Sequence, residues 1–292
     1  MSSHNSPIWR ILAASVPGTS HIRSGEGCED AHSYRAIGDT VILAIADGAG
    51  SAQCAIQGAS EAVAAAVKSL GNQIAAHSSP LDHSDMEIML NTACYDAREA
   101  IERLVEQGSS EILSIADANT PISPIPPLIP LDDISSKTSI QPSGVPKRSI
   151  RDFASTLLII CVTADVAGAA QVGDGAIIVQ YIDGTLMSLF EPIRSEYINE
   201  TDFLTDLNYR QHLQMTVMPA SNIYGIALLT DGMQLLAIQI ADNLPHPPFF
   251  MPLFTFAANP ESTSQDLAEF LQSPRVNART DDDKTMLIAV RT

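Results

Sequence analysis

The residues whose type and position could do chemistry are aspartates that directly follow apolar segments. Val41 to Ala46 is an apolar run that ends in Asp47-Gly48, and the stretch after it reads as a helix. The arrangement recurs at Asp174 and Asp231, while the pair Glu29 and Asp30 lies upstream and the run from Asp281 to Asp283 lies near the C-terminus. Carboxylates gathered from distant parts of a chain are typical ligands of hard divalent cations. The pattern therefore predicts a shared metal site.

A structural interpretation of these residues stays open, because Asp-Gly is also a common turn dipeptide. Asp183-Gly184 lies between two short strands and reads as a plain hairpin turn, as does Asp39 beside Gly38. Asp174 also suits a hairpin, and the run near the C-terminus suits a solvated loop or a cap. Asp47 and Asp231 each end a long apolar strand that leads into a helix, where a turn or cap and a metal ligand are both reasonable. The joint pattern favours the metal site.

The composition narrows the class of protein. The chain has 292 residues, of which 45% are hydrophobic and 17% charged, so it can bury a substantial core as one large or two small globular domains. The balance of 16 Lys and Arg against 34 Asp and Glu gives a net charge of −18, which argues against a nucleic-acid partner or an anionic membrane. No apolar stretch approaches the ~18 residues of a membrane span, and the N-terminus lacks the order of a secretory signal. The four cysteines have no CxxC spacing, which predicts reduced thiols and a cytoplasmic location.

Hydrophobic periodicity predicts a mixed α and β fold. Strands are predicted at residues 9–16, 29–37, 41–46, 154–163, 167–172, 176–182, 185–189, 223–229 and 285–290. Helices are predicted at 56–76, 85–107, 233–240, 252–258 and 261–271, and irregular polar segments at 19–28 and 191–218. Helices come in pairs between blocks of hairpin strands, so we expect antiparallel sheets with helices outside.

Residues from about 108 to 148 differ from the rest of the chain. Gly108 is expected to close the helix before them, and the segment is then dense in Pro and Ser without a sustained period. We interpret it as a long surface insertion rather than a linker between domains. The alternative is a docking or regulatory segment.

Six short motifs, taken together, make the sequence similar to a known family. They are CEDAH (28–32), ADGAGSA (46–52), ASTL (154–157), VGDG (172–175), TDG (230–232) and DDKT (282–285). In this order and spacing they resemble the protein phosphatase 2C family of metal-dependent Ser/Thr phosphatases, in its shorter bacterial-type branch. The resemblance implies one domain over residues 1–292, interrupted by the insertion. It also implies an α+β fold, a four-layer α-β-β-α sandwich with two central antiparallel β-sheets.

The resemblance further implies roles for individual residues. Asp47 would bridge two metal ions, and the Gly48 carbonyl would bind one of them. Asp231 and Asp282 would complete the shell of one ion. Asp30 would serve the second ion directly or through water, with Glu29 close by, and Asp174 would help Asp231 to hold a third. Oxygen ligands suit Mg²⁺ or Mn²⁺, in two or three ions, rather than Zn²⁺. The implied catalytic set is Asp47, Asp231 and Asp282, around a metal-bridged water that attacks the phosphorus without a covalent intermediate.

The sequence departs from the family pattern at two positions. Many relatives have a basic residue shortly before the acidic pair to bind the phosphate, whereas here Gly25 stands at that position and Arg23 lies seven residues before Asp30. We take Arg23 as the candidate, with a solvated loop arginine as the alternative. Ala49 stands where many relatives place a histidine, a proton donor to the leaving group. His21 or His32 could replace it, although each could also be structural.

The leading hypothesis is a phosphoprotein Ser/Thr phosphatase whose partners are a phosphorylated protein substrate and a cognate kinase. The first alternative is a phosphatase-like binding or sensing module with little turnover, which Ala49 would allow. A second alternative is another two-metal phosphoesterase such as a nuclease, which the acidic composition disfavours.

Overall fold

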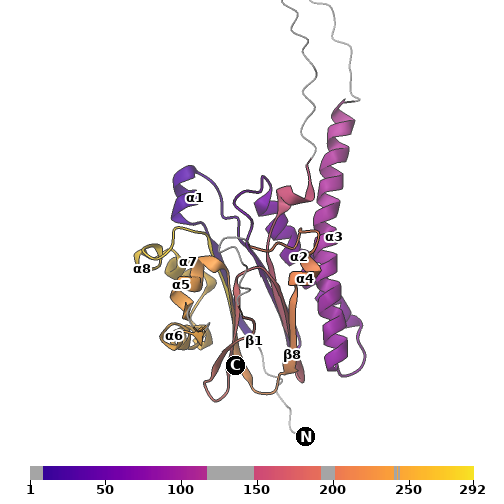
Figure 1. Cartoon of the computed structure of the whole chain (residues 1–292). Helices are drawn as coiled ribbons and strands as arrows, with labels where there is room; N and C mark the ends of the chain where they lie inside the picture. The colour runs from indigo at the N-terminus through magenta and orange to yellow at the C-terminus, as the bar shows by residue number, and fades with distance from the viewer. Residues whose placement is uncertain (1–8, 117–147, 192–200, 240–241, 243) are drawn as a thin grey trace, which may run out of the picture.

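Two antiparallel five-stranded sheets packed face to face form the centre of the protein (Figure 1). The computed structural model describes residues 9–116, 148–191, 201–239, 242 and 244–292, without side chains for 108–116. One sheet has the order β1 (Trp9–Val16), β12 (Lys284–Arg291), β9 (Ile223–Leu229), β6 (Ala176–Tyr181) and β7 (Leu186–Ser188). The other has the order β2 (Ala31–Ile37), β3 (Thr40–Ala46), β4 (Leu157–Val162), β5 (Val166–Val172) and β8 (Gln214–Pro219). Strands β10 (Ile238–Gln239) and β11 (Leu244–Pro245) pair separately.

Strand β3 shows why the apolar runs form central strands. All seven of its residues are buried, and successive side chains of a strand point to opposite faces. Val41, Leu43 and Ile45 enter the core between the two sheets. Ile42 and Ala44 enter the core between the sheet and its covering helices. A strand buried on both faces needs the continuous apolar run that the sequence has here.

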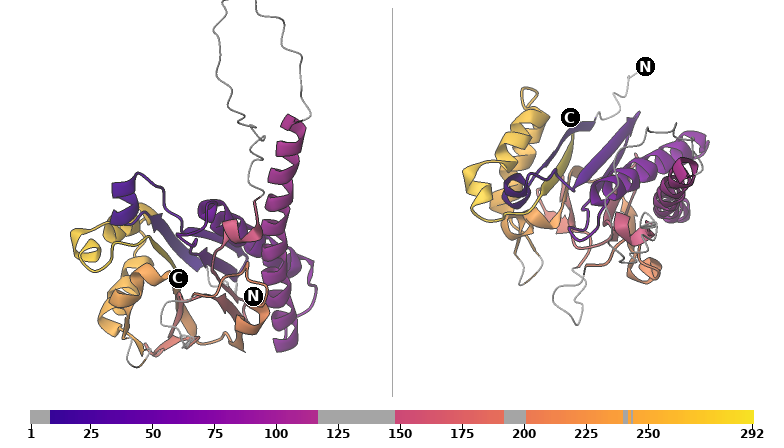
Figure 2. Two further views of the ribbon diagram at one scale, coloured as in Figure 1. Left: turned by 45° about the horizontal axis from the view of Figure 1, so that its top comes forward. Right: turned by 90° about the horizontal axis from the view of Figure 1, so that it is seen from above.

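Helices cover the outer face of each sheet, which confirms the expected four-layer α-β-β-α architecture (Figure 2). α2 (Ala55–Ala76) and α3 (His83–Ala116) pack on the β2–β8 sheet. The β1–β7 sheet is covered by α5 (Gln234–Ala237), α6 (Pro247–Ala258), α7 (Ser264–Leu271) and α8 (Pro274–Asn277). The remaining short helices are α1 (Thr19–Ser24), α4 (Tyr209–His212) and the 3-10 turns Ile150–Phe153 and Asp231–Met233. No helix in the described ranges has the length and hydropathy needed to cross a bilayer.

Several element boundaries differ from the sequence prediction. Residues 19–24 form α1 rather than a loop, and the helix ends at Gly25 with φ of 80°. α3 continues through Gly108 to Ala116, because one helical glycine costs only about 1 kcal/mol relative to alanine. β8 lies in the segment expected to be irregular, and its Met215 and Val217 pack on the helical side of the sheet. The predicted insertion therefore begins inside a helix, and residues 117–147 lie outside the described residues.

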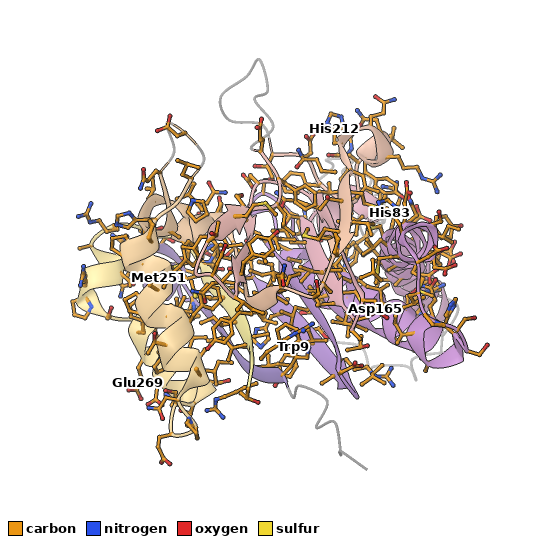
Figure 3. All side chains as sticks on the ribbon, turned by 90° about the horizontal axis from the view of Figure 1, so that it is seen from below. Trp9, His83, Asp165, His212, Met251 and Glu269 are labelled. Atoms are coloured by element: carbon orange, nitrogen blue, oxygen red, sulfur yellow. The ribbon has the colours of Figure 1, made fainter. Side chains whose placement is uncertain are left out.

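The chain reversals that carry the aspartates lie at one end of the sandwich, the end of α1 in Figure 1. β5 and β6 belong to different sheets, so the Gly173-Asp174-Gly175 turn carries the chain from one sheet to the other. The Asp183-Gly184 turn joins β6 and β7 as the predicted hairpin. Figure 3 shows the opposite end, where Trp9 is labelled between the two helical layers and closes the core between the sheets.

Candidate metal centre and active site

Five of the predicted site residues line one cavity of about 280 Å³ at this end: Glu29, Asp47, Gly48, Asp231 and Asp282. The cavity also contacts Asp283, from the predicted run of aspartates, and residues that the sequence did not place in a site: Ser51, Thr156, Thr201 and Phe203. The ligand candidates therefore come from four separated parts of the chain, as the pattern of aspartates predicted.

Asp47 is fixed by hydrogen bonds to the strand beside it. Its N–H donates to Thr156 Oγ1 at 2.8 Å, and the N–H of Thr156 donates to the Asp47 carbonyl at 2.8 Å. Gly48 forms a bridge with Ser155, and a Cβ at Gly48 would lie 2.8 Å from the Glu29 carbonyl oxygen. Only glycine allows this close approach, which brings Asp47 and Glu29 to the same cavity.

Asp231 begins the 3-10 turn after β9, and its carboxyl group lies close enough to that of Asp47 for each to affect the pKa of the other. Burial raises the pKa of both carboxyl groups, and the neighbouring charges of Asp30 and Asp174 raise the pKa of Asp47 and Asp231 respectively. Carboxylates that are crowded and desolvated in this way favour a bound proton or a cation. Asp47 and Asp231 thus form the acidic centre of the cavity.

Asp30 lies behind the cavity wall rather than on it. Its side chain is buried, and Thr230 Oγ1 donates to Asp30 Oδ2 at 2.7 Å. Burial raises the pKa of Asp30, against the lowering effect of the Thr230 hydrogen bond, and the charge of Asp283 raises it further. Asp174 also lies beside the cavity, where its Oδ2 accepts a hydrogen bond of 2.8 Å from Thr201 Oγ1.

The carboxylate oxygens fit a divalent cation by their chemistry. Among the described residues, three buried carboxylate oxygens have no hydrogen-bond donor: Glu29 Oε2, Asp30 Oδ1 and Asp231 Oδ1. A buried carboxylate oxygen without a donor is costly unless a cation satisfies it. In the part of the chain that the structure describes, no three Asp, Glu, His or Cys side chains form a group that could hold an ion by themselves. Mg²⁺ usually keeps several waters and takes one or two carboxylates. Paired carboxylates with unsatisfied oxygens are therefore sufficient protein ligands for such an ion.

Asp283, next to the predicted ligand Asp282, holds the segments that carry Gly18, His21 and Glu29. Its Oδ1 accepts from the Gly18 N–H at 2.6 Å and contacts His21 Nδ1 at 2.9 Å, and its Oδ2 accepts from the Glu29 N–H at 2.5 Å. Asp283 is 3% exposed. The run of three aspartates was the available signal, but only the packing shows that both oxygens of Asp283 take part in structural contacts, whereas Asp282 accepts one backbone hydrogen bond, from the Asp283 N–H at 2.8 Å.

Comparison with known proteins identifies the family. The family model described as protein phosphatase 2C matches residues 17–272. The chain belongs to the protein phosphatase 2C family. The serine/threonine-protein phosphatase 3 of Escherichia coli is 30% identical over 97% of this chain and 98% of that protein.

Solved structures agree on the protein phosphatase 2C fold. The Staphylococcus aureus serine/threonine phosphatase Stp1 has a TM-score of 0.57 at 11% identity and covers 100% of this chain and 98% of its own. A bacterial serine phosphatase has a TM-score of 0.57 at 12% identity and covers 98% of both chains. At such identities the likeness shows the fold alone.

The structure does not bring Arg23 to the cavity of this protein phosphatase 2C chain. Arg23 Nε donates to the Thr19 carbonyl at 2.8 Å, and Nη2 lies 3.8 Å from Asp281 Oδ2 in a pair whose side chains are 71% and 75% exposed. Among the described residues that line the cavity there is no Lys or Arg. The solvated alternative for Arg23 is therefore the better description, because the short helix α1 directs it toward Asp281.

Of the two histidines considered as replacements for the one absent at Ala49, only His21 lines the cavity. Burial lowers the pKa of His21, but the hydrogen bond and charge of Asp283 outweigh it, so the pKa is raised overall. His32 instead contacts Ser15 Oγ through Nδ1 at 2.7 Å, and burial lowers its pKa. A structural role therefore describes His32, whereas His21 is placed to act on a ligand in the cavity.

Proposed function

We propose that this protein phosphatase 2C chain is a metal-dependent phosphoprotein Ser/Thr phosphatase, a hydrolase of phosphomonoesters. The observation that carries the proposal is the half-buried pair Asp47 and Asp231 on the wall of a cavity where Glu29 Oε2 and Asp231 Oδ1 have no hydrogen-bond donor. The name of the relative from Escherichia coli, a serine/threonine-protein phosphatase, supports the substrate class.

The residues that would hold two Mg²⁺ or Mn²⁺ ions are those of the cavity wall. Asp47, the Gly48 carbonyl, Asp231 and Asp282 would hold the ions at the centre, with Glu29 also on the wall and Asp30 behind it. Asp174 lies close enough to Asp231 for its charge to raise the pKa of Asp231. We therefore assign Asp174 as a ligand of a third ion. When bound, divalent cations neutralise phosphoryl oxygens and make water a nucleophile at neutral pH.

The chain itself supplies positioning and a proton. Thr156 and Ser155 hold the Asp47-Gly48 turn in place, so the central carboxylates need not reorganise when substrate binds. Asp283 orients the His21 ring through Nδ1, which leaves Nε2 to donate a proton to the leaving serine or threonine oxygen. With no Lys or Arg among the described cavity residues, phosphate binding would depend mainly on the ions.

The expected partner is a phosphorylated protein, with a cognate kinase as its counterpart, rather than nucleic acid or membrane. The net charge of −18 supports this choice, because nucleic acids and anionic lipids attract basic surfaces. All four cysteines are free in the structure, which supports the cytoplasm as the compartment.

The direct test measures phosphate release from p-nitrophenyl phosphate and from a phosphothreonine peptide, with Mn²⁺ and with excess chelator. Asp231→Asn should reduce turnover by several orders of magnitude, roughly the loss seen when essential catalytic groups are removed. Asp183→Asn is the matched control, since it changes an Asp-Gly pair in the exposed β6–β7 turn and should leave turnover unchanged.

Activity that persists in chelator and in Asp231→Asn would refute the metal assignment. Binding of a phosphopeptide without turnover, in Mn²⁺ and for the wild type, would favour the sensing module that Ala49 allows.

A further inference from the structure

Part of the cavity wall comes from the chain between Thr201 and His212. Thr201 and Phe203 line the cavity. The Leu204 N–H donates to the Ser155 carbonyl at 2.8 Å, and Ser155 precedes Thr156, which fixes Asp47. This segment, the 201–212 wall, is therefore attached to the same strand that positions the central carboxylate.

Arg98, on the middle of α3, holds the 201–212 wall from behind. Its Nη1 donates to the Leu204 carbonyl at 2.7 Å and to the Asp206 carbonyl at 2.6 Å. Its guanidinium lies 5.0 Å from the centre of the Tyr209 ring, and its Nε donates to Glu102 Oε1 at 3.1 Å. One side chain thus contacts three positions of the wall. Figures 1 and 3 show α4, with His212 labelled at its end, on the same side of the molecule as α3.

The contacts of Arg98 fix a turn that ends at the cavity. Asp206 Oδ2 accepts from the Phe203 N–H at 2.8 Å, and the Asp206 N–H donates to the Phe203 carbonyl at 3.0 Å. Leu204 and Tyr209 are buried in the core under α3. A charged group that donates to two backbone carbonyls makes stronger bonds than a neutral donor would. Losing it would leave the partly buried Leu204 carbonyl without this donor and the Asp206 carbonyl with only the Tyr209 N–H at 3.3 Å, and it would release the turn that carries Phe203.

We propose that Arg98 is a positioning residue for substrate binding: it seats the 201–212 wall so that Thr201 and Phe203 contact the residues that flank the phosphorylated side chain. The proposal rests on the proposed phosphatase function. Arg98 touches no candidate metal ligand, so its loss should weaken binding of a peptide and leave the chemical step largely unchanged.

The test compares Arg98→Ala with Arg103→Ala on the same helix. Arg103 is a matched control, because its recorded contact is an exposed i,i+4 pair with Glu99 at 2.9 Å. With Mn²⁺ at saturation, Arg98→Ala should raise KM for a phosphothreonine peptide by about tenfold, with kcat and the rate on p-nitrophenyl phosphate within about twofold of wild type. Arg103→Ala should change neither.

Amide hydrogen exchange provides a readout that does not depend on activity. Exchange at residues 201–209 should rise in Arg98→Ala while exchange in β3 and β9 stays unchanged, and Arg103→Ala should match wild type. If Arg98→Ala does not fold, Arg98→Lys keeps the charge but cannot stack on Tyr209, so it should show a smaller change in the same direction.

Unchanged exchange at residues 201–209 in a folded Arg98 variant, or a loss of kcat without a change in KM, would overturn the proposal. If the wild type releases no phosphate, the proposed function has failed, and the hydrogen exchange still decides whether Arg98 seats the wall.

Discussion

At the scale of single residues, the same residue type has different roles depending on its neighbours. Asp282 and Asp283 both line the cavity, but Asp283 uses its oxygens to contact two backbone N–H groups and His21. Lys284, next in the chain, is fully buried, and its Nζ donates to the Asp282 carbonyl at 3.1 Å. Burial lowers the pKa of Lys284, against the raising effect of Asp283. The buried cation offsets part of the negative charge behind the site, a role that its position in a strand did not indicate.

The position of His21 leads to a prediction about the leaving group. An alkoxide from phosphothreonine needs a proton in the transition state and p-nitrophenolate does not, and a general acid typically contributes about 10²–10⁴-fold where a proton is needed. His21→Ala should therefore slow phosphopeptide hydrolysis by at least about tenfold more than p-nitrophenyl phosphate hydrolysis. The measurement is the ratio of the two kcat values.

Two further variants complete this comparison. Because His21 already lines the cavity, Ala49→His should give little gain on the phosphopeptide. His32→Ala should leave the ratio unchanged, since His32 contacts Ser15 away from the cavity. A ratio that does not respond to His21→Ala would show that the proton comes from another donor or that chemistry does not limit turnover.

At the scale of elements, short structures were harder to recognise than long ones. α1 has only six residues, and its available signals were Gly25 after it and His21 and Arg23 in its last turn. β8 is an edge strand that ends at Pro219. Proline is tolerated at this position because an edge strand has a neighbour on one side only, so the missing N–H need not remove a hydrogen bond between strands. Both elements matter for function, because α1 carries His21 and β8 follows the 201–212 wall.

The composition of residues 117–147 predicts that they contribute little to stability. Replacing them with a Gly/Ser linker of about ten residues should change the unfolding temperature little, because loop-closure entropy varies only slowly with length. α3 should be kept to Ala116, since it is helical to that residue. Thermal unfolding in Mn²⁺ is the measurement, and a large loss of stability would show that the segment packs on the domain.

At the scale of the whole molecule, the acidic centre couples stability to cations. Burial raises the pKa of Asp47 and Asp231, so at neutral pH their ionised forms oppose folding unless a proton or a cation is shared between them. A ligand present at 100 times its Kd stabilises a fold by about 2.7 kcal/mol. The metal site and the fold should therefore stabilise each other.

Asp47→Asn should separate the cost of the crowded carboxylates from the stability gained by metal binding. In excess chelator the variant should unfold a few degrees above wild type, since about 1 kcal/mol shifts the unfolding temperature of a domain of 150 to 250 residues by about 2–4 °C. In saturating Mn²⁺ the order should reverse, because wild type gains the binding energy. Calorimetry of both proteins in both buffers is the measurement, with Asp183→Asn as the control that follows wild type throughout. An equal response of Asp47→Asn and wild type to Mn²⁺ would contradict the role of Asp47 as a ligand.

The sequence by itself determined the fold class and the central aspartates. Continuous apolar runs such as Val41–Ala46, bounded by turn residues, favour buried strands, and Asp47 and Asp231 lie at the ends of such runs. Only the tertiary structure decided how the other candidates are used. It turned Arg23 toward Asp281, brought His21 into the cavity, gave Asp283 its structural role and placed Arg98 behind the 201–212 wall. The physical reason is that strand formation depends on local periodicity, whereas a side chain's partners depend on segments that are more than a hundred residues away in the chain.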